Sequence, residues 1–294
     1  AGIGFADSLM FMQLGFRDAL FDCAVKCHTN VNGEIFLISP QSTALIAMKS
    51  FPRRRLYQTL AVNGVDAVTP IYLGFQIWKN PVNKNTRQIM TIGFNPADKQ
   101  LFQLPGVAEN LDKMQLPDTY LFDTKSRDQF GPIAKMFESG QRVQTEVGGR
   151  RIEGGGLFTL GPSVGADGNM LTSDTNCIRM FNKRDKGLID VGVVKLKPGT
   201  DVQSTINAME AYLPKDVKVF SKAQFIEFER NYWQTGTSIG FIFTLGTIMG
   251  FIVGIVIVYQ ILYTDVADHL SEYATLKAMG YTDFYLLTVV FQEA

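Results

Sequence analysis

The chain has 294 residues, of which 46% are hydrophobic and 19% are charged, and 28 Lys and Arg residues balance 28 Asp and Glu residues. This length accommodates one large domain or two modest domains, each with a hydrophobic core. The zero net charge argues against a nucleic-acid-binding protein, since the longest basic block is Arg53–Arg55. Cys23, Cys27 and Cys177 form no regular disulfide framework, although a single pairing stays open.

The two ends of the chain are apolar. Residues 1–16 carry one charge, Asp7, and no basic leader precedes them, so they do not form a signal peptide. We expect them to be the end of a first transmembrane helix, which continues as a stalk helix over residues 17–31. The closing residues 284–294 are expected to begin another membrane helix. Each end is therefore interpreted as a cut inside a membrane helix.

A β–α–β unit is predicted after the stalk. The apolar run EIFLIS, residues 34–39, is typical of a buried strand, and residues 52–64 form a helix with Pro at its start and Gly at its stop. Residues 66–75 then return as a second strand. These elements make residues 32–77 the first half of an α/β lobe.

A second β–α–β unit is predicted over residues 191–222. Its helix is expected to begin at a Thr200 cap, with Gln203 completing a capping box. The helix should bury one face, because its apolar residues are spaced by 4, 3 and 4: Val202, Ile206, Met209 and Leu213. The two units together suggest a ferredoxin-like α/β layer in an α+β domain.

An insert, residues 78–190, separates the two units and is rich in short strands and turns. Gly148–Gly149 lies between two strand-like runs and supplies the positive φ angles of a two-residue hairpin turn. The insert should therefore form a smaller, mainly β lobe.

A transmembrane helix is predicted at residues 237–262, after a second stalk helix over residues 223–236 that is expected to run straight into it. No charged residue occurs from Asn231 to Thr264, a run of 34 residues. A helix of this predicted span would be about 39 Å long, whereas the hydrocarbon core needs about 30 Å. Three glycines at i+4 spacing predict a face for close helix packing, within the chain or across a dimer: Gly246, Gly250 and Gly254.

A short amphipathic helix is predicted in the loop that follows, residues 263–283. Gly280 is a suitable stop, Lys277 suits the end of the helix dipole, and Thr282 caps the next helix. Such a helix between two membrane spans predicts a docking surface for a partner. Its apolar stripe comprises Val266, Leu270, Tyr273, Leu276 and Met279.

Enzymatic and metal sites find little support in the sequence. The GPSVG motif, residues 161–165, matches a nucleophile elbow, but a turn rather than a helix follows it. The Cys23, Cys27 and His28 group has no second cluster with which to complete a zinc site. No nucleotide-binding glycine motif occurs. We therefore expect no enzyme, no cofactor and no metal, and any ATPase would be another chain.

The residues from Glu272 to Gly280 resemble the cytoplasmic loop of MacB-like and FtsX-like ABC transporter permeases. They share a glutamate, a spacer ending in an aliphatic residue, and lysine followed by Ala-Met-Gly. Together with GFADSLMFMQLGFRDALFD and EIFLISPQS, the string HLSEYATLKAMGYTDFYLL is similar to the DevC type of that family. The resemblance covers essentially the whole chain. It implies an ATPase-coupling helix formed by Glu272, Tyr273, Ala274, Thr275, Leu276, Lys277, Ala278, Met279 and Gly280.

The resemblance also implies partners and a location. The DevC type comprises cyanobacterial permeases that work with a DevA ATPase and a DevB membrane-fusion protein to export envelope glycolipids. The chain would be a homodimeric, multi-pass protein of the bacterial inner membrane with a large periplasmic domain, and an outer-membrane channel would complete the assembly. ATP-driven movement of the coupling helix would be transmitted mechanically to that domain. Two alternatives stay open: a membrane-anchored sensor that binds an extracytoplasmic ligand, and a lipoprotein-releasing or cell-division permease of the same superfamily.

Overall fold

The chain forms two structural units in the computed structural model, which describes residues 2–181 and 184–293. The helical unit comprises residues 1–20 and 234–294, and the α/β unit comprises Phe21–Trp233. Residues 1, 182–183 and 294 belong to the predicted first segment, insert and last segment, and they lie outside the described residues.

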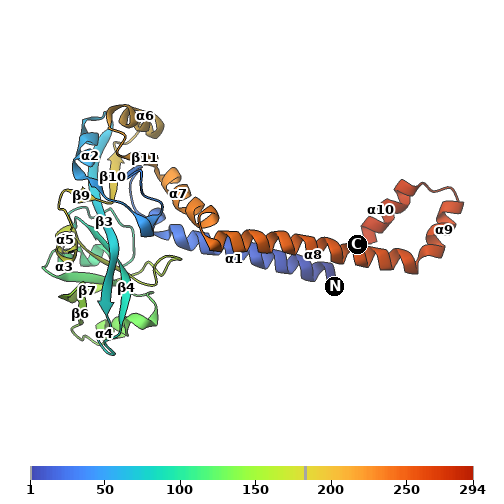
Figure 1. Ribbon diagram of the computed structural model, residues 1–294, viewed down its shortest axis with the longest axis horizontal. Coiled ribbons are helices and arrows are strands. Elements are labelled where there is room, and N and C mark those ends of the chain that lie inside the picture. Colours follow the sequence, from blue (N-terminus) through green and yellow to red (C-terminus); the bar gives the residue numbers. More distant parts are fainter. Residues whose placement is uncertain (1, 182–183, 294) are drawn as a thin grey trace. The chain divides into compact units, whose positions relative to one another are not determined.

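One end of the α/β unit, the sheet lobe, is built on four antiparallel strands in the order β11-β1-β10-β3 (Figure 1). Helix α2 lies between β1 and β3 in the chain, and α6 lies between β10 and β11, so both predicted β–α–β units are present. The bounds are β1 (Ile35–Ile38), α2 (Arg53–Gln58), β3 (Val65–Lys79), β10 (Val191–Leu196), α6 (Val202–Tyr212) and β11 (Lys218–Ser221).

Side chains alternate across β1 and bury both faces of the sheet. Ile35 and Leu37 join a core with Leu56 of α2 and Ile206 of α6, whereas Phe36 lies in the core on the opposite face. The predicted stripe of α6 is confirmed: Ile206, Met209 and Leu213 are buried, and Val202 packs against the same core.

Six strands close on themselves to form the other end of the α/β unit, the β-rich lobe. Their order is β3-β4-β8-β5-β7-β6, and β6 also pairs with the end of β3 through Trp78 and Val147. The strand β3, with 15 residues, runs through both lobes: residues 65–71 pair with β10 of the sheet lobe, and residues 71–79 pair with β4. The remaining bounds are β4 (Thr86–Phe94), β5 (Thr119–Asp123), β6 (Gln144–Val147), β7 (Arg150–Phe158) and β8 (Asn169–Ser173).

Aromatic side chains fill the closed sheet. Trp78, Tyr120, Phe122 and Phe130 belong to one buried cluster, and the Trp78 indole N–H donates to the Phe130 carbonyl at 3.0 Å. The predicted hairpin joins β6 to β7, with φ of 57° at Gly148 and 78° at Gly149, as a two-residue turn requires. Short helices complete the lobe, namely α3 (Leu111–Met114), α4 (Ile133–Glu138) and α5 (Asp174–Met180), and a two-stranded pairing, β2 (Phe51–Pro52) with β9 (Leu188–Ile189), lies beside α2.

The predicted start of α6 was wrong by one residue. Asp201, not Thr200, is the N-cap, and its carboxylate accepts the Ser204 N–H at 2.7 Å. The Thr200 N–H instead donates to the Lys197 carbonyl and closes the preceding turn. The predicted capping box is also absent, because the Gln203 side chain donates to Asn207.

Two predicted helix boundaries also differ from the structure. The helix expected over residues 52–64 ends as an α-helix at Gln58 and continues only as a 3-10 turn, Thr59–Ala61. The stalk helix, α7 (Lys222–Thr235), does not run straight into the next helix, α8 (Ser238–Asp268). Thr237 lies between them in an extended conformation, and its hydroxyl accepts the Gly240 N–H as a new N-cap. A glycine followed by a capping threonine favours this break.

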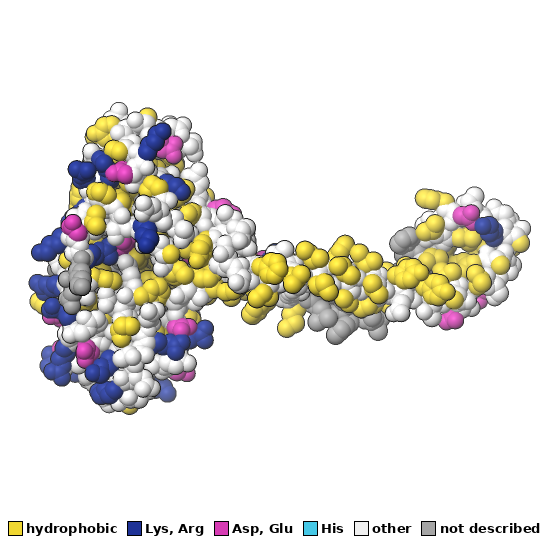
Figure 2. Space-filling model, viewed as in Figure 1, with side chains coloured by type: hydrophobic (Ala, Val, Ile, Leu, Met, Phe, Trp, Pro, Cys, Tyr) yellow, Lys and Arg dark blue, Asp and Glu magenta, His cyan; other side chains and the backbone are white. Residues whose placement is uncertain are grey.

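The helical unit contains most of α1 (Gly2–Asn30), which lies beside α8, followed by α9 (Leu270–Ala278) and α10 (Asp283–Glu293) (Figure 1). Among the residues that the structure describes, α8 is the one helix long and apolar enough to cross a membrane, with a mean hydropathy of 2.6. Only 6% of that apolar window is buried, and hydrophobic side chains cover its visible face (Figure 2). Such a surface requires an apolar environment or a protein partner.

Candidate functional site

The predicted coupling residues lie on α9 and on the turn that ends it. Gly280 has a φ of 97°, and its N–H donates to the Lys277 carbonyl, while the Tyr281 N–H donates to the Leu276 carbonyl. These two bonds are those of a Schellman motif, so the predicted glycine stop is confirmed. Thr282 then accepts the Tyr285 N–H at the start of α10, as predicted for a cap.

The predicted apolar stripe of this helix is interrupted. Val266 belongs to α8, since the chain turns at His269 before α9 begins. Leu270 is 62% exposed and Met279 is 63% exposed, whereas Tyr273 and Leu276 are half-buried. The stripe predicted over one helix is therefore divided between two, and α9 presents apolar side chains to its surroundings.

The charges around α9 are only partly compensated. The Lys277 ammonium pairs with Asp283 at 2.6 Å, and both side chains stay exposed, so the two charges compensate each other at the surface. Glu272 and Asp268 are exposed carboxylates nearby. The free charge on this part of the helical unit is consequently negative.

Gly246, the first glycine of the predicted packing face, lies against α1 of the same chain. A Cβ at Gly246 would lie 2.0 Å from the Gln13 amide nitrogen, and Phe16 and Phe243 have ring centroids 5.8 Å apart. Gly250 is half-buried and Gly254 is buried, although most of the α8 residues around them are exposed. The atoms in the way belong to the end of the flexible Gln13 side chain, which can rotate aside, so alanine at position 246 is compatible with the observed approach of α1.

A buried polar junction that the sequence analysis missed joins α1, α7 and the 3-10 turn Leu45–Ala47. Glu229 of α7 accepts the Leu45 N–H at 2.7 Å and the Trp233 indole N–H at 2.8 Å. The His28 Nε2 of α1 lies 3.5 Å from the same carboxylate, and its ring packs on Phe225. The signal for it was Glu229 itself, a charged residue four positions from Phe225 and four from Trp233, on an apolar stripe.

Burial sets the protonation of this junction. The His28 and Glu229 side chains are 0% and 2% exposed. Burial lowers the pKa of His28 from 6.5 to about 3, and it raises the pKa of Glu229. The imidazole is therefore neutral at ordinary pH.

The residues considered above for metal binding or catalysis are the three cysteines and Ser163 of the GPSVG segment. Cys23, Cys27 and Cys177 are free thiols, and burial raises the pKa of the Cys27 thiol to about 12. Among the described residues, no three His, Cys, Asp or Glu side chains are arranged to hold a metal ion. In the GPSVG segment a turn follows Ser163, whose hydroxyl accepts the Ala166 N–H at 3.2 Å.

Comparisons with known proteins give distant likenesses. No family model matches the sequence, and no curated protein matches it. The extracellular domain of the noncanonical ABC-type transporter YknZ from Gram-positive bacteria is 14% identical, with a TM-score of 0.43, covering 64% of this chain and 100% of that one. The periplasmic region of MacB from Actinobacillus actinomycetemcomitans is 9% identical, with a TM-score of 0.46, covering 70% of this chain and 95% of that one.

Proposed function

We propose that the chain is the permease subunit of an ABC transporter of the MacB-like and FtsX-like type. The observation that carries the proposal is the string from His269 to Leu287. It resembles the coupling loop of that family and folds into a short exposed helix with a Schellman stop, between the apolar helix α8 and the capped helix α10. A short, exposed helix between two membrane-spanning helices is suited to receive a displacement from a bound partner.

In this proposal α8 crosses the inner membrane, α10 and the first part of α1 enter it, and the α/β unit lies in the periplasm. The sheet lobe is the ferredoxin-like layer, since its β–α–β–β–α–β order is that of the predicted units. The chain would act as a homodimer with a DevA-like ATPase, a DevB-like membrane-fusion protein and an outer-membrane channel. Its cargo would be lipid-like, with an envelope glycolipid as the specific expectation from the DevC resemblance.

The partner ATPase supplies the chemistry, and this chain supplies the mechanical coupling. The apolar side chains Leu270 and Met279 are the contacts that α9 offers, and Glu272 and Asp268 require cationic groups opposite them. Movement of α9 would then displace α8, which is a single helix of 31 residues. A long unbroken helix transmits an axial displacement because its backbone hydrogen bonds resist stretching.

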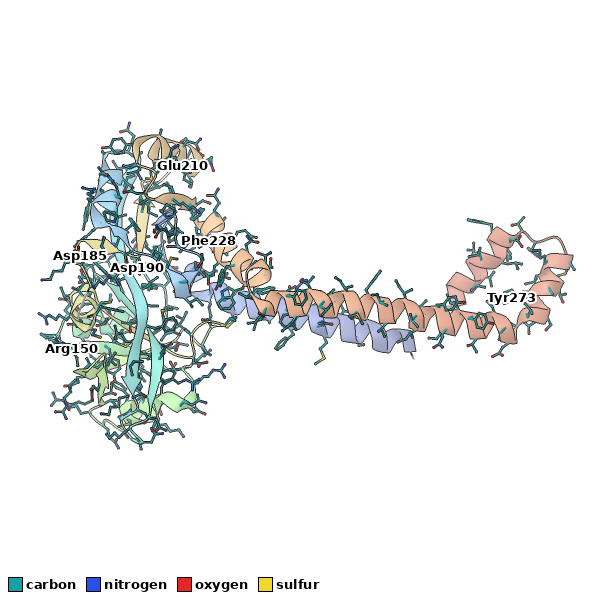
Figure 3. The ribbon with its side chains drawn as sticks, viewed as in Figure 1. Arg150, Asp185, Asp190, Glu210, Phe228 and Tyr273 are labelled. Carbon is teal, nitrogen blue, oxygen red and sulfur yellow. The ribbon has the colours of Figure 1, made fainter. Side chains whose placement is uncertain are left out.

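The test uses the full-length protein reconstituted with its cognate ABC ATPase. Replacing Glu272 by Lys should reduce permease-stimulated ATP hydrolysis by about tenfold, because it places a cation against the partner's cationic surface. Glu210→Lys is the matched control, because Glu210 is also an exposed glutamate on a helix, but on α6 of the α/β unit. Figure 3 labels Glu210, and it labels Tyr273 to locate α9. The proposal fails if no ABC ATPase co-purifies with the protein, or if Glu272→Lys and Glu210→Lys stimulate hydrolysis equally.

A further inference from the structure

The loop that contains GPSVG, residues 159–168, is anchored to the β-rich lobe at its start. Asp123 ends β5 and is completely buried, and its carboxylate accepts the backbone N–H groups of Leu160 at 3.0 Å and Gly161 at 2.8 Å. The Asn169 amide, at the start of β8, donates to Asp123 and to the Gly161 carbonyl, each at 2.9 Å. Two strands of the lobe therefore fix the entry to the loop.

The same loop lies against both helices that leave the α/β unit. On α1, the Cys23 thiol donates to the Pro162 carbonyl at 2.9 Å. At Gly165, an added Cβ would lie 2.3 Å from Ile46 Cγ2 and 3.2 Å from Trp233 Cζ2 of α7. No side chain fits at position 165 without displacing one of these neighbours.

The loop is also closed internally. The Ser163 N–H donates to the Ala166 carbonyl at 2.8 Å, and Ala166 is buried in the same core cluster as Phe225 of α7. Reciprocal hydrogen bonds and a buried apolar residue make a short loop stiff. A stiff loop can transmit a displacement between the elements that it joins.

Chain connectivity explains why such a link is needed. Helix α1 leads directly into β1, and β11 leads directly into α7, so both helices are continuous with the sheet lobe. The β-rich lobe is not continuous with either helix: the chain joins it to the sheet lobe through β3 and again between α5 and β10, and its other attachments are non-covalent contacts. We propose that residues 159–168 are the link through which the pair α1 and α7 holds the β-rich lobe and moves it. The movement rests on the proposed function, whereas the attachment itself does not.

The reactivity of two native cysteines reports whether the loop 159–168 is in contact with α1. Cys23 is half-buried and its thiol is bonded to the loop, whereas Cys177 is completely buried elsewhere and serves as an internal reference for unfolding. In full-length protein in detergent, mass spectrometry would follow alkylation of each thiol by N-ethylmaleimide. Gly165→Ala should raise the Cys23 rate about tenfold, because the overpacked contact with Ile46 lifts the loop, and should leave Cys177 unreactive.

Two variants serve as controls. Gly187→Ala changes another loop glycine with an ordinary φ, whose Cβ would meet only the Asp185 carboxylate at 3.3 Å, so the Cys23 rate should equal that of the wild type. The double variant Ile46→Ala with Gly165→Ala removes the clashing atom, and its Cys23 rate should return toward the wild-type rate.

The attachment is refuted if Gly165→Ala leaves the Cys23 rate unchanged. If Gly165→Ala also makes Cys177 reactive, Asn169→Ala becomes the deciding variant, because it releases the loop without adding volume. If Cys23 and Cys177 are then accelerated equally in Asn169→Ala, the attachment is refuted as well. With the partner ATPase present, Gly165→Ala should retain ATP hydrolysis and lose export. If the proposed function is wrong, only the expectation about ATP hydrolysis and export is lost. The alkylation rates of Cys23 and Cys177 still test the attachment of the loop.

Discussion

At the scale of single residues, the buried pair of His28 and Glu229 carries a desolvation cost, because its side chains are 0% and 2% exposed. Each Glu229 oxygen accepts one N–H donor, from Leu45 and from Trp233, which compensates for part of the desolvation of the carboxylate. Along the chain, Leu45 lies 184 residues from Glu229, whereas Trp233 lies four residues from it. The carboxylate thus ties a loop and a helix together beside α1.

The depressed pKa of His28 predicts a loss of stability in mild acid. The unfolded chain binds a proton at His28 below pH 6.5, whereas the folded chain resists protonation down to about pH 3, so stability is present above pH 6.5 and is lost as the pH falls. Lowering the pH from 7.5 to 5.5 should lower the unfolding free energy by about 1 kcal/mol. Urea unfolding of the solubilised protein at the two pH values measures this change.

His28→Gln is the matched control for that measurement. It keeps a polar side chain at the position and removes the titration, so its loss of stability between pH 7.5 and 5.5 should be smaller than that of the wild type. The raised pKa of Glu229 has the opposite effect on stability, because it lowers the unfolding free energy as the pH rises above 4.5. This contribution is present in both the wild type and the variant. An equal pH dependence of the two proteins would contradict the assignment to His28.

At the scale of elements, the turn after α9 shows what one glycine contributes. Gly280 adopts a φ of 97° at no steric cost, and a Cβ there would be strained although no atom lies within 4 Å. Gly280→Ala should destabilise the Schellman turn by about 1 kcal/mol. Hydrogen exchange at the Tyr281 amide should then accelerate roughly fivefold, since that amide donates to the Leu276 carbonyl across the turn.

Gly15→Ala separates the backbone effect from a general loss of glycine. Gly15 lies inside α1 with no atom within 4 Å of an added Cβ and without a left-handed φ, so alanine should be accepted there. An unchanged exchange rate at Tyr281 in Gly280→Ala would mean that the turn does not depend on the glycine.

Patterns confined to one element predicted that element well. The stripe of α6, the Gly148–Gly149 hairpin and the Gly280 stop each depend on residues a few positions apart, and the sequence predicted each of them. Features that join distant segments were not predicted. The contact of His28 with Glu229 and the pairing of β3 with β6 depend on tertiary packing, which no local period encodes.

Errors at helix ends had local causes of a different kind. Thr200 and Asp201 are both good N-cap residues, and the turn at Lys197 decided between them by using the Thr200 N–H. The break at Thr237 was missed because hydropathy predicts where a span is but carries no information about the caps at its ends.

At the scale of the whole molecule, sharing β3 predicts that the two lobes of the α/β unit unfold together. Trp78 lies in the core of the β-rich lobe, and Trp233 lies where α7 meets the turn Leu45–Ala47 and the loop 159–168, so the first indole reports that core and the second reports the junction. Each of the variants Trp78→Phe and Trp233→Phe keeps a single tryptophan. In each variant, the urea transition followed by tryptophan fluorescence should coincide with the transition followed by far-ultraviolet circular dichroism. A fluorescence transition completed before the circular dichroism change would show that one lobe unfolds alone.

The position of β1 between β10 and β11 has a consequence for biosynthesis. All four residues of β1 are buried and apolar, and its first partner strand begins at Val191, 153 residues after Ile38. At about 5–20 residues per second, a ribosome needs roughly 8–30 s to make that interval. Throughout this time β1 is an unpaired hydrophobic segment, of the kind that aggregates when exposed. The nascent chain therefore requires a chaperone, or early burial against the following residues, before its central strand can be completed.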